Sequence, residues 1–348
     1  MKKLILTLVL CAALSTLAIG APTIYVAQAV HNFGSVFEGI AVEYTFVIEN
    51  RGDEALDISG VSASCGCTTT SKPTEPIEPG KSFSLDVLIN TTGFGGTISK
   101  TITVYSNDPE SPLLSLRVTG QVLKSDPYHI SASDAYYLLY ALIDLRPADE
   151  FEAYHLLGAV NLQPDELTTA LSELPHETFI ILYDAAGDTV DEAALSLRNE
   201  GFAFVHTLLG GLNEWIYQYE TKNLLSGSET YTLPPHVSID TSDRQNSELL
   251  PSELDYLFYL YVDVRPADEF DAGHIIGAIN IPFDELESSS EILPKGALVL
   301  VYDQDGSLGD EAALWMINND FSNTQSILGG LNEWIRQYGE NYLLPVSQ

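Results

Sequence analysis

The sequence predicts a multidomain protein: an all-β sandwich followed by two α/β domains, each with a parallel sheet covered by helices on both faces. Residues 21–123 consist of short, mostly alternating apolar runs separated by turn residues, which is typical of a sandwich. The remainder alternates strand-like and helix-like segments. It also contains one unit twice, because equivalent residues such as Asp184 and Asp303 lie 303 − 184 = 119 positions apart in two nearly gapless copies.

Residues 1–20 have the pattern of a secretory signal. Two lysines at the start precede the apolar run 4–19, and small residues around Gly20 supply a cleavage site. The run is short for a membrane span. We therefore expect an exported protein, periplasmic or extracellular, which touches a membrane only if the signal stays uncleaved. Lipidation of Cys11 is not expected, because Leu10 stands where a lipoprotein signal needs a small residue.

The composition of the chain is that of an acidic globular protein. Its 348 residues suffice for two or three domains, and its apolar content of 45% is ordinary. It carries 49 Asp and Glu against 15 Lys and Arg, which gives a net charge of −34. Such a chain is repelled by phosphate backbones and anionic membranes, so nucleic acid is excluded as a partner. A solvated acidic surface suited to export explains the charge more simply than an acidic ligand site does.

The sandwich region shows strands and turns at regular spacing. We expect strands at 44–48, 56–58, 83–89, 101–105 and 114–118. Turn residues at 50–53, 79–80, 93–96 and 107–109 separate them. We assign residues 21–123 to this domain.

Cys65 and Cys67 are the two cysteines left after signal removal. With one Gly between them, they can form a small disulfide, act as a redox pair, or supply half of a soft-metal site. A complete zinc site needs four ligands, and the sequence has no second Cys pair or close His pair. We favour a local structural feature at a strand end, with a redox pair as the alternative.

Five motifs of this region occur in the order of a known family. They are His31–Gly39, Phe46–Asn50, Ser64-Cys-Gly-Cys-Thr68, Ile77–Gly80 and Tyr105–Pro109. Together they closely resemble an uncharacterised bacterial immunoglobulin-like family with a Cys-Gly-Cys-Thr signature. The resemblance implies an exported immunoglobulin-like domain and brings no catalytic activity with it.

The two α/β repeats are expected at 128–220 and 249–340, joined by a linker rich in Ser, Thr, Pro and Asp at 221–248. For the first repeat we predict helices at 135–142, 192–199 and 213–219, and strands at 143–145, 158–162, 179–183 and 204–208. Strands that alternate with helices favour a parallel sheet.

Three paired motifs carry a second resemblance. They are Ile143–Phe151 with Val262–Phe270, Gly273–Pro282 with the weaker Tyr154–Leu162, and the two Gly-Gly-Leu-Asn-Glu-Trp runs that end at Trp215 and Trp334. This ordered series, present twice, resembles the rhodanese family of sulfurtransferases. It implies two rhodanese-like domains after the immunoglobulin-like domain.

Each repeat contains a loop between a strand and a helix, at 182–188 and 301–307. Successive backbone N–H groups converge at such a turn, and the helix dipole adds partial positive charge, which suits an anion. The first residue after the apolar run of the strand is nevertheless an aspartate, Asp184 or Asp303.

The resemblance implies a Cys at that position, whose thiolate takes a sulfane sulfur as a persulfide. Matching the family's loop onto this chain places Asp184 and Asp303 at that position. Gly187 and Gly306 match the glycine of the family's loop, which is vestigial here, and Thr189 and Leu308 stand where the family often has a basic residue. A carboxylate is a poor nucleophile toward sulfur and cannot hold a persulfide. We predict no catalytic residue, and we expect each Asp to accept the loop N–H groups itself as an internal anion.

The other polar candidates are interpreted as pocket or structural residues. We expect His155 and His274 to orient their loops, and Asp144–Arg146 and Asp263–Arg265 to form a repeated ion pair beside the vestigial pocket. Asp303, Asp305 and Asp310 lack the spacing and closing Glu of a calcium loop. We therefore predict neither a metal nor a cofactor.

Three functions are compatible with the sequence. The first is a non-catalytic binding or scaffolding protein on a retired enzyme fold, with an unidentified protein or small-molecule partner. The second is a sulfurtransferase or thiol-redox protein that uses Cys65 and Cys67, and the third is metal-dependent or ligand-sensing use of the acidic loops. We predict the first, because both loops carry the same substitution.

Overall fold

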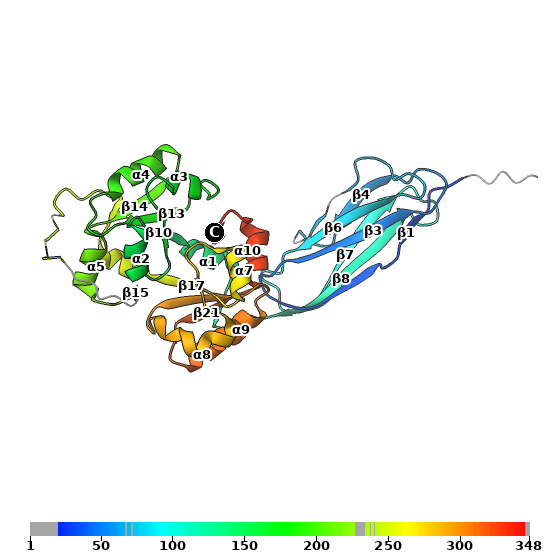
Figure 1. The fold of residues 1–348 in the computed structure, drawn as a ribbon. Coiled ribbons are helices and arrows are strands. Elements are labelled where there is room, and N and C mark those ends of the chain that lie inside the picture. Colours follow the sequence, from blue (N-terminus) through cyan, green and yellow to red (C-terminus); the bar gives the residue numbers. More distant parts are fainter. Residues whose placement is uncertain are drawn as a thin grey trace, which may run out of the picture. The chain divides into compact units, whose positions relative to one another are not determined.

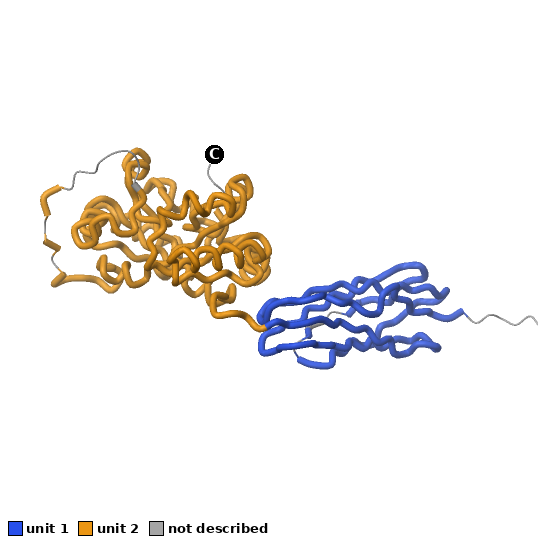
Figure 2. The backbone as a smooth tube through the Cα atoms, turned by 90° about the horizontal axis from the view of Figure 1, so that it is seen from below, with its two compact units in different colours: residues 1–123 blue, residues 124–348 orange. Residues whose placement is uncertain are grey.

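The computed structural model describes residues 20–66, 68–70, 72–226, 234–236, 238–239 and 241–344. The chain divides into two compact units, residues 1–123 and 124–348, which Figure 2 distinguishes by colour. The expected signal lies almost wholly outside the described residues. Within them, no helix combines the length and the hydropathy that a membrane crossing needs.

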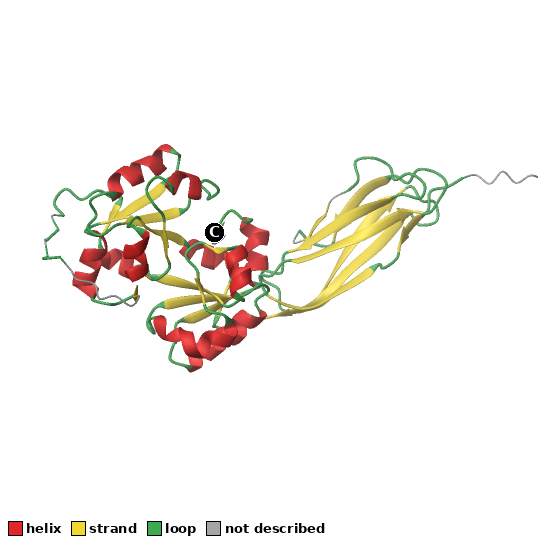
Figure 3. Ribbon diagram, in the orientation of Figure 1, coloured by secondary structure: helices red, strands yellow, loops and turns green. Residues whose placement is uncertain are grey.

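The first unit is a β-sandwich of two four-stranded sheets. One sheet has the order β1 (Ile24–Val26), β3 (Val42–Asn50), β6 (Ser82–Ile89) and β5 (Thr68–Thr70). The other has the order β2 (Val30–Phe37), β8 (Leu113–Leu123), β7 (Gly96–Ser106) and β4 (Ile58–Ala63). Alternate residues of the longer strands point inward, as Leu116, Val118 and Val122 of β8 do, and form one apolar core. The predicted all-β first domain is therefore confirmed (Figure 3).

The second unit contains two five-stranded sheets in which all neighbours are parallel. The first sheet has the order β12 (Ala159–Asn161), β10 (Tyr140–Asp144), β13 (Phe179–Tyr183), β14 (Phe204–Leu208) and β16 (Glu248–Leu249). The second has the order β19 (Ile279–Asn280), β17 (Tyr259–Asp263), β20 (Leu298–Tyr302), β21 (Thr324–Ile327) and β9 (His129–Ile130).

Helices lie on both sides of these sheets (Figure 3). In the first repeat they are α1 (Ala132–Leu138), α2 (Ala148–Ala153), α3 (Leu167–Ala170), α4 (Val190–Asn199) and α5 (Gly211–Tyr219). In the second they are α6 (Pro251–Tyr256), α7 (Ala267–Ala272), α8 (Leu286–Ser289), α9 (Ser307–Asn318) and α10 (Gly330–Tyr338), with 3₁₀ turns η1 (Phe283–Glu285) and η2 (Ser290–Ile292). Figure 1 labels most of these elements.

The two repeats exchange their first strands. β9, at the start of the first repeat, pairs with β21 of the second, and β16, at the start of the second, pairs with β14 of the first. The helices that follow these strands cross over too, since α1 contacts α10 and α6 contacts α5. Two apolar cores each contain residues of both repeats; Ile130 and Trp334 share one, and Leu249 and Trp215 share the other. The repeats therefore form one unit.

Several expected boundaries differ from the structure; for example, the strand expected at 56–58 begins at Ile58 and the one expected at 143–145 is Tyr140–Asp144. The helix expected at 135–142 ends at Leu138, because Leu139 is extended and the following residues join the buried strand β10. The linker expected at 221–248 is shorter, because β15 (Leu224–Ser226) pairs with β11 (Tyr154–Leu156) of the first repeat. In the second repeat β22 (Leu343–Leu344) pairs with β18 (His274–Ile275) in the same way.

Candidate functional site

The loop after β13 is closed around the carboxylate of Asp184, which is 7% exposed. One oxygen, Oδ1, accepts from the N–H of Ala186 at 2.9 Å and from that of Gly187. The other, Oδ2, accepts from Thr189, from its N–H at 2.8 Å and from its hydroxyl at 2.6 Å. The N–H groups that converge at the entrance to α4 thus meet an anion that belongs to the chain.

The loop after β20 repeats this arrangement around Asp303, which is 4% exposed. Its carboxylate accepts from the N–H groups of Gly306 at 2.7 Å, Leu308 at 3.1 Å and Gly309 at 3.2 Å. Burial raises the pKa of Asp303, and these three hydrogen bonds only partly oppose the shift. Gly306 has φ +93°, a conformation that glycine adopts without strain, and it caps α9.

The two Gly-Gly-Leu-Asn-Glu-Trp motifs hold these loops in place. The N–H of Leu212 donates to the carbonyl oxygen of Asp184 at 2.9 Å, and that of Leu331 donates to the carbonyl oxygen of Asp303 at 2.8 Å. A Cβ on Gly211 would lie 2.5 Å from the backbone carbonyl oxygen of Asp184. The second glycine is therefore required by close approach of the backbone. The sequence pattern identified the motif, but only the structure gives its role.

The repeated Asp-x-Arg motif forms a buried, bidentate ion pair in both repeats. Arg146 Nη2 lies 2.7 Å from Asp144 Oδ2, and Arg265 Nη2 lies 2.6 Å from Asp263 Oδ2. The same Nη2 also donates to a backbone carbonyl, that of Tyr154 at 2.7 Å or of Gly273 at 2.8 Å. These arginines tie the end of the central strand to the chain that follows α2 or α7.

His155 and His274 are packed against the helix that precedes them. Each ring stacks at 3.7 Å on the ring of Phe151 or Phe270, and its Nδ1 lies 2.8 or 3.0 Å from the carbonyl oxygen of the same residue. A carbonyl can only accept, so Nδ1 carries the proton. Burial lowers the pKa of both histidines. These contacts are compatible with a structural role, and the expectation that each histidine orients the turn that follows it stays a prediction.

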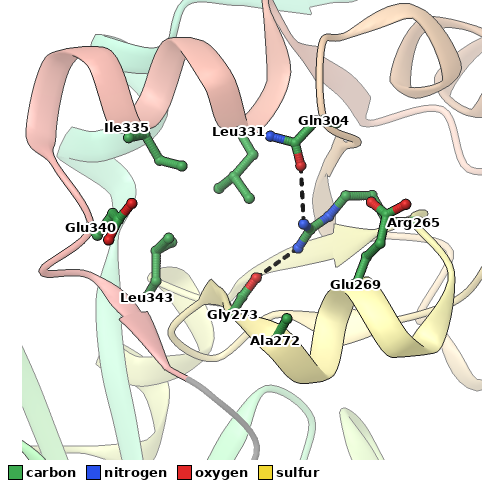
Figure 4. A pocket seen from close by; sticks show the side chains of 9 residues that line it. All are labelled: Arg265, Glu269, Ala272, Gly273, Gln304, Leu331, Ile335, Glu340 and Leu343. Carbon is green, nitrogen blue, oxygen red and sulfur yellow. Dashed lines mark hydrogen bonds between the residues drawn. The ribbon is translucent and has the colours of Figure 1, made fainter.

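A pocket of about 400 Å³ adjoins the acidic loop of the second repeat (Figure 4). Gln304, the residue after Asp303, lies at its edge, where its Oε1 accepts from Arg265 Nη1 at 3.2 Å. Leu331 and Ile335 of α10 form one wall, and Leu343 lies opposite Gly273. The sequence suggested Arg265 for this position but gave no indication of the aliphatic wall.

The first repeat has a large side chain at the equivalent place. Tyr154 stands 119 positions before Gly273 (273 − 154 = 119) and is 7% exposed. Its ring centroid lies 5.0 Å from the guanidinium carbon of Arg146. Ala185 takes the place of Gln304. The two repeats therefore differ beside their loops, although their apolar walls match.

The described residues contain no group of three or more His, Cys, Asp or Glu side chains that could hold a metal ion. Asp305 accepts from the hydroxyl of Ser307 at 2.6 Å, and Asp310 lies 3.2 Å from Nε2 of His129. The three carboxylates at 303, 305 and 310 therefore have separate partners.

The Cys-Gly-Cys segment lies in the first unit. Cys65 is disulfide-bonded, and its Sγ lies 3.5 Å from the hydroxyl oxygen of Thr68. Cys67 lies outside the described residues. The redox role of Cys65 and Cys67 stays a prediction.

Comparison with family models supports both resemblances. A model described as a rhodanese-like domain matches residues 131–218 and 248–337, about half of the chain. The chain belongs to the rhodanese-like family. A second model, described as a protein of unknown function (DUF1573), matches residues 24–122. The order of domains predicted from the sequence is therefore confirmed.

The chain is similar to curated proteins with different names. A tRNA uridine(34) hydroxylase of Photorhabdus laumondii is 23% identical over 67% of this chain and 68% of its own length. The uncharacterised protein YqhL of Bacillus subtilis is 34% identical over 21% of this chain and 59% of its own. A centrosomal protein of 41 kDa from Xenopus laevis is 29% identical, but the match spans 33% of that protein.

The chain is also similar to parts of solved structures. A thiosulfate sulfurtransferase from Pseudomonas aeruginosa is 22% identical, with a TM-score of 0.24 over 63% of this chain and 44% of its own. A rhodanese-related protein from Thermoplasma volcanium is 27% identical, with a TM-score of 0.23 over 25% of this chain and 88% of its own.

Proposed function

We propose that this rhodanese-like chain is an exported pseudoenzyme whose domains act as binding or scaffolding modules. The observation that carries the proposal is the occupancy of the loop by its own carboxylate. Asp184 takes N–H groups at 2.8 and 2.9 Å, and Asp303 does so at 2.7, 3.1 and 3.2 Å. These N–H groups are not open to an anionic substrate, and a carboxylate forms no persulfide.

The charge around the second loop supports the same function. Arg265 is held by Asp263, while Glu269 and Glu340 lie at the edge of the adjoining pocket. A thiosulfate dianion would therefore meet like charge. Export is part of the proposal and is supported by the signal pattern of residues 1–20 and the net charge of −34.

A thiosulfate:cyanide sulfurtransferase assay on the mature protein tests the proposal. We expect no turnover above the uncatalysed rate. Asp184→Cys and Asp303→Cys are the informative variants, with Asp184→Ser and Asp303→Ser as matched controls that fit the loop but hold no sulfane sulfur. The N–H groups of the loop should lower the pKa of the new thiol, so it should react with iodoacetamide faster than a free cysteine at pH 7.

Turnover by the natural protein would contradict the proposal. If Cys65→Ser together with Cys67→Ser removed that turnover, the chemistry would belong to the first unit. If the pair had no effect, the acidic loops themselves would be catalytic.

A further inference from the structure

The pocket of the second repeat has an aliphatic wall between two carboxylates. Leu331 and Ile335 of α10, Leu343 of β22 and Ala272 of α7 line it. Figure 4 shows Glu340 and Glu269 on opposite sides of the pocket, with Leu331 between them. A volume of about 400 Å³ is ample for a small molecule.

Its single arginine is held by the fold, and its charge is balanced by the buried carboxylate of Asp263. The Nε and Nη2 of Arg265 donate to Asp263, Nη2 also donates to Gly273, and Nη1 donates to Gln304. The carboxylates of Glu269 and Glu340 are both exposed, and among the residues that the structure describes neither has a side-chain hydrogen bond or an ion pair within 4.0 Å, although the charge of Glu269 contributes to the raised pKa of Arg265. The pocket is therefore negative at both ends and apolar between them.

We propose that this pocket binds an α,ω-diamine, an aliphatic chain with an ammonium group at each end. The inference rests on the proposed function, since it treats the pocket beside the acidic loop as a binding site. Each ammonium would pair with one carboxylate, and the methylene chain would lie along Leu331 and Ile335. An anion is repelled at both ends, and a neutral apolar molecule leaves both carboxylates unpaired.

The first repeat supplies an internal comparison. Its apolar wall is the same, because Leu212, Ile216 and Leu224 stand 119 positions before Leu331, Ile335 and Leu343 (331 − 212 = 119). One polar position differs, because Thr221 replaces Glu340, whereas the equivalent Glu150 and Glu269 both lie beside their arginine. Tyr154 replaces Gly273. The features that the diamine requires occur in the second repeat alone, although the surrounding scaffold is shared.

The test is a titration of the mature, ¹⁵N-labelled full chain at low salt, followed by amide NMR shifts. The probes are the diamines from 1,3-diaminopropane to 1,6-diaminohexane, with n-butylamine, 1,4-butanediol and succinate as charge controls. We expect diamines to shift Gln304 and Leu331, with one chain length binding best. The diol and succinate should leave these resonances unchanged.

Variants distinguish diamine binding in the pocket from non-specific attraction to the acidic surface. Glu269→Gln and Glu340→Gln should each weaken diamine binding roughly two- to five-fold, because ion pairs of exposed carboxylates are weak. Gly273→Tyr should abolish binding, and it should fold, since a Cβ there meets only Leu343 Cβ at 4.0 Å. Glu150→Gln, at the equivalent position of the first repeat, should have no effect.

Three results would overturn the inference, and they bear differently on the function. Equal binding to the natural protein and to the double variant Glu269→Gln, Glu340→Gln would mean non-specific attraction. If no diamine shifted any resonance, the proposal of a diamine site would be wrong, and the proposed pseudoenzyme function would be unaffected. Shifts of Gln304 by thiosulfate, a further probe, would contradict both, because they would place a sulfur donor in the pocket.

Discussion

At the scale of single residues, the two acidic loops show how a side chain can occupy a site that its own backbone creates. The strand-to-helix turn directs several N–H groups to one point, and in water or in the fold each needs an acceptor. Asp184 and Asp303 supply it with both carboxylate oxygens. The loop should therefore be a stabilising element, because its donors are satisfied.

Removing the carboxylate of Asp184 should destabilise the second unit. In Asp184→Ala the N–H groups of Ala186, Gly187 and Thr189 lose their acceptor, at a cost of about 1–3 kcal/mol. Asp184→Asn should cost less, since one carbonyl oxygen remains. Urea unfolding measures both, and Asp188→Ala, an exposed position of the same loop, is the control with about zero change. Equal stability of the Asp184→Ala variant and the control would show that water replaces the carboxylate.

The buried histidines should make stability depend on pH. Burial lowers the pKa of His155 and His274 below 6.5, so the unfolded chain binds protons first as the pH falls. Their contribution to the free energy of unfolding is complete above 6.5 and decreases below it. Urea midpoints at pH 7.5 and 5.5 should therefore differ less in the double variant His155→Gln, His274→Gln than in the natural protein. An unchanged difference would assign the effect to other groups.

Much of this site could be predicted from the sequence. The position of Asp184 and Asp303 at a strand-to-helix turn implied that they would accept the loop N–H groups. The pocket could not be predicted, because its wall combines residues of α10 and β22 that are brought to α7 by pairing of β18 with β22. A comparison of the two repeats at Tyr154 and Gly273 was the one available signal.

At the scale of secondary-structure elements, the second glycine of each Gly-Gly motif fixes how closely a helix approaches the loop. Gly211→Ala and Gly330→Ala would place a Cβ against the carbonyl oxygen of Asp184 or Asp303, at φ of +58° and +56°. We expect each to cost about 1–3 kcal/mol or more in thermal or urea unfolding. Gly296→Ala is the matched control, since no atom lies within 4 Å of its Cβ, and it should be neutral or slightly stabilising.

Elements were predictable where one periodic pattern dominated. β13 at Phe179–Tyr183 and β14 at Phe204–Leu208 coincide with the predicted strands. The expected helix at 135–142 was wrong in its second half, because a run of apolar residues does not by itself separate a helix from a buried strand. β9 and β16 have two residues each, which is too short for any local signal. Their pairing depends on the other repeat.

At the scale of the whole molecule, the exchange of first strands makes each repeat complete only in the presence of the other. β9 and α1 lie on the second repeat, where the hydroxyl of Tyr261 donates to the carbonyl oxygen of Ala135 at 2.5 Å. β16 and α6 lie on the first. Separating the repeats would expose Trp215 and Trp334, which are fully buried, and would leave β14 and β21 as open edges.

Cutting the chain between the repeats should therefore not separate them. A protease site introduced between Ser226 and Thr241 allows cleavage after folding, and we expect the two fragments to co-elute and to unfold in one transition. Each fragment expressed alone should aggregate or pair with a second copy of itself, because its edge strand and its half of each apolar core have no partner. Mixing refolded fragments should restore the co-eluting species. Two fragments that separate and each melt cooperatively would show that the exchange is dispensable. Their association would show that the exchanged strands and the shared apolar cores hold both repeats together as one folding unit.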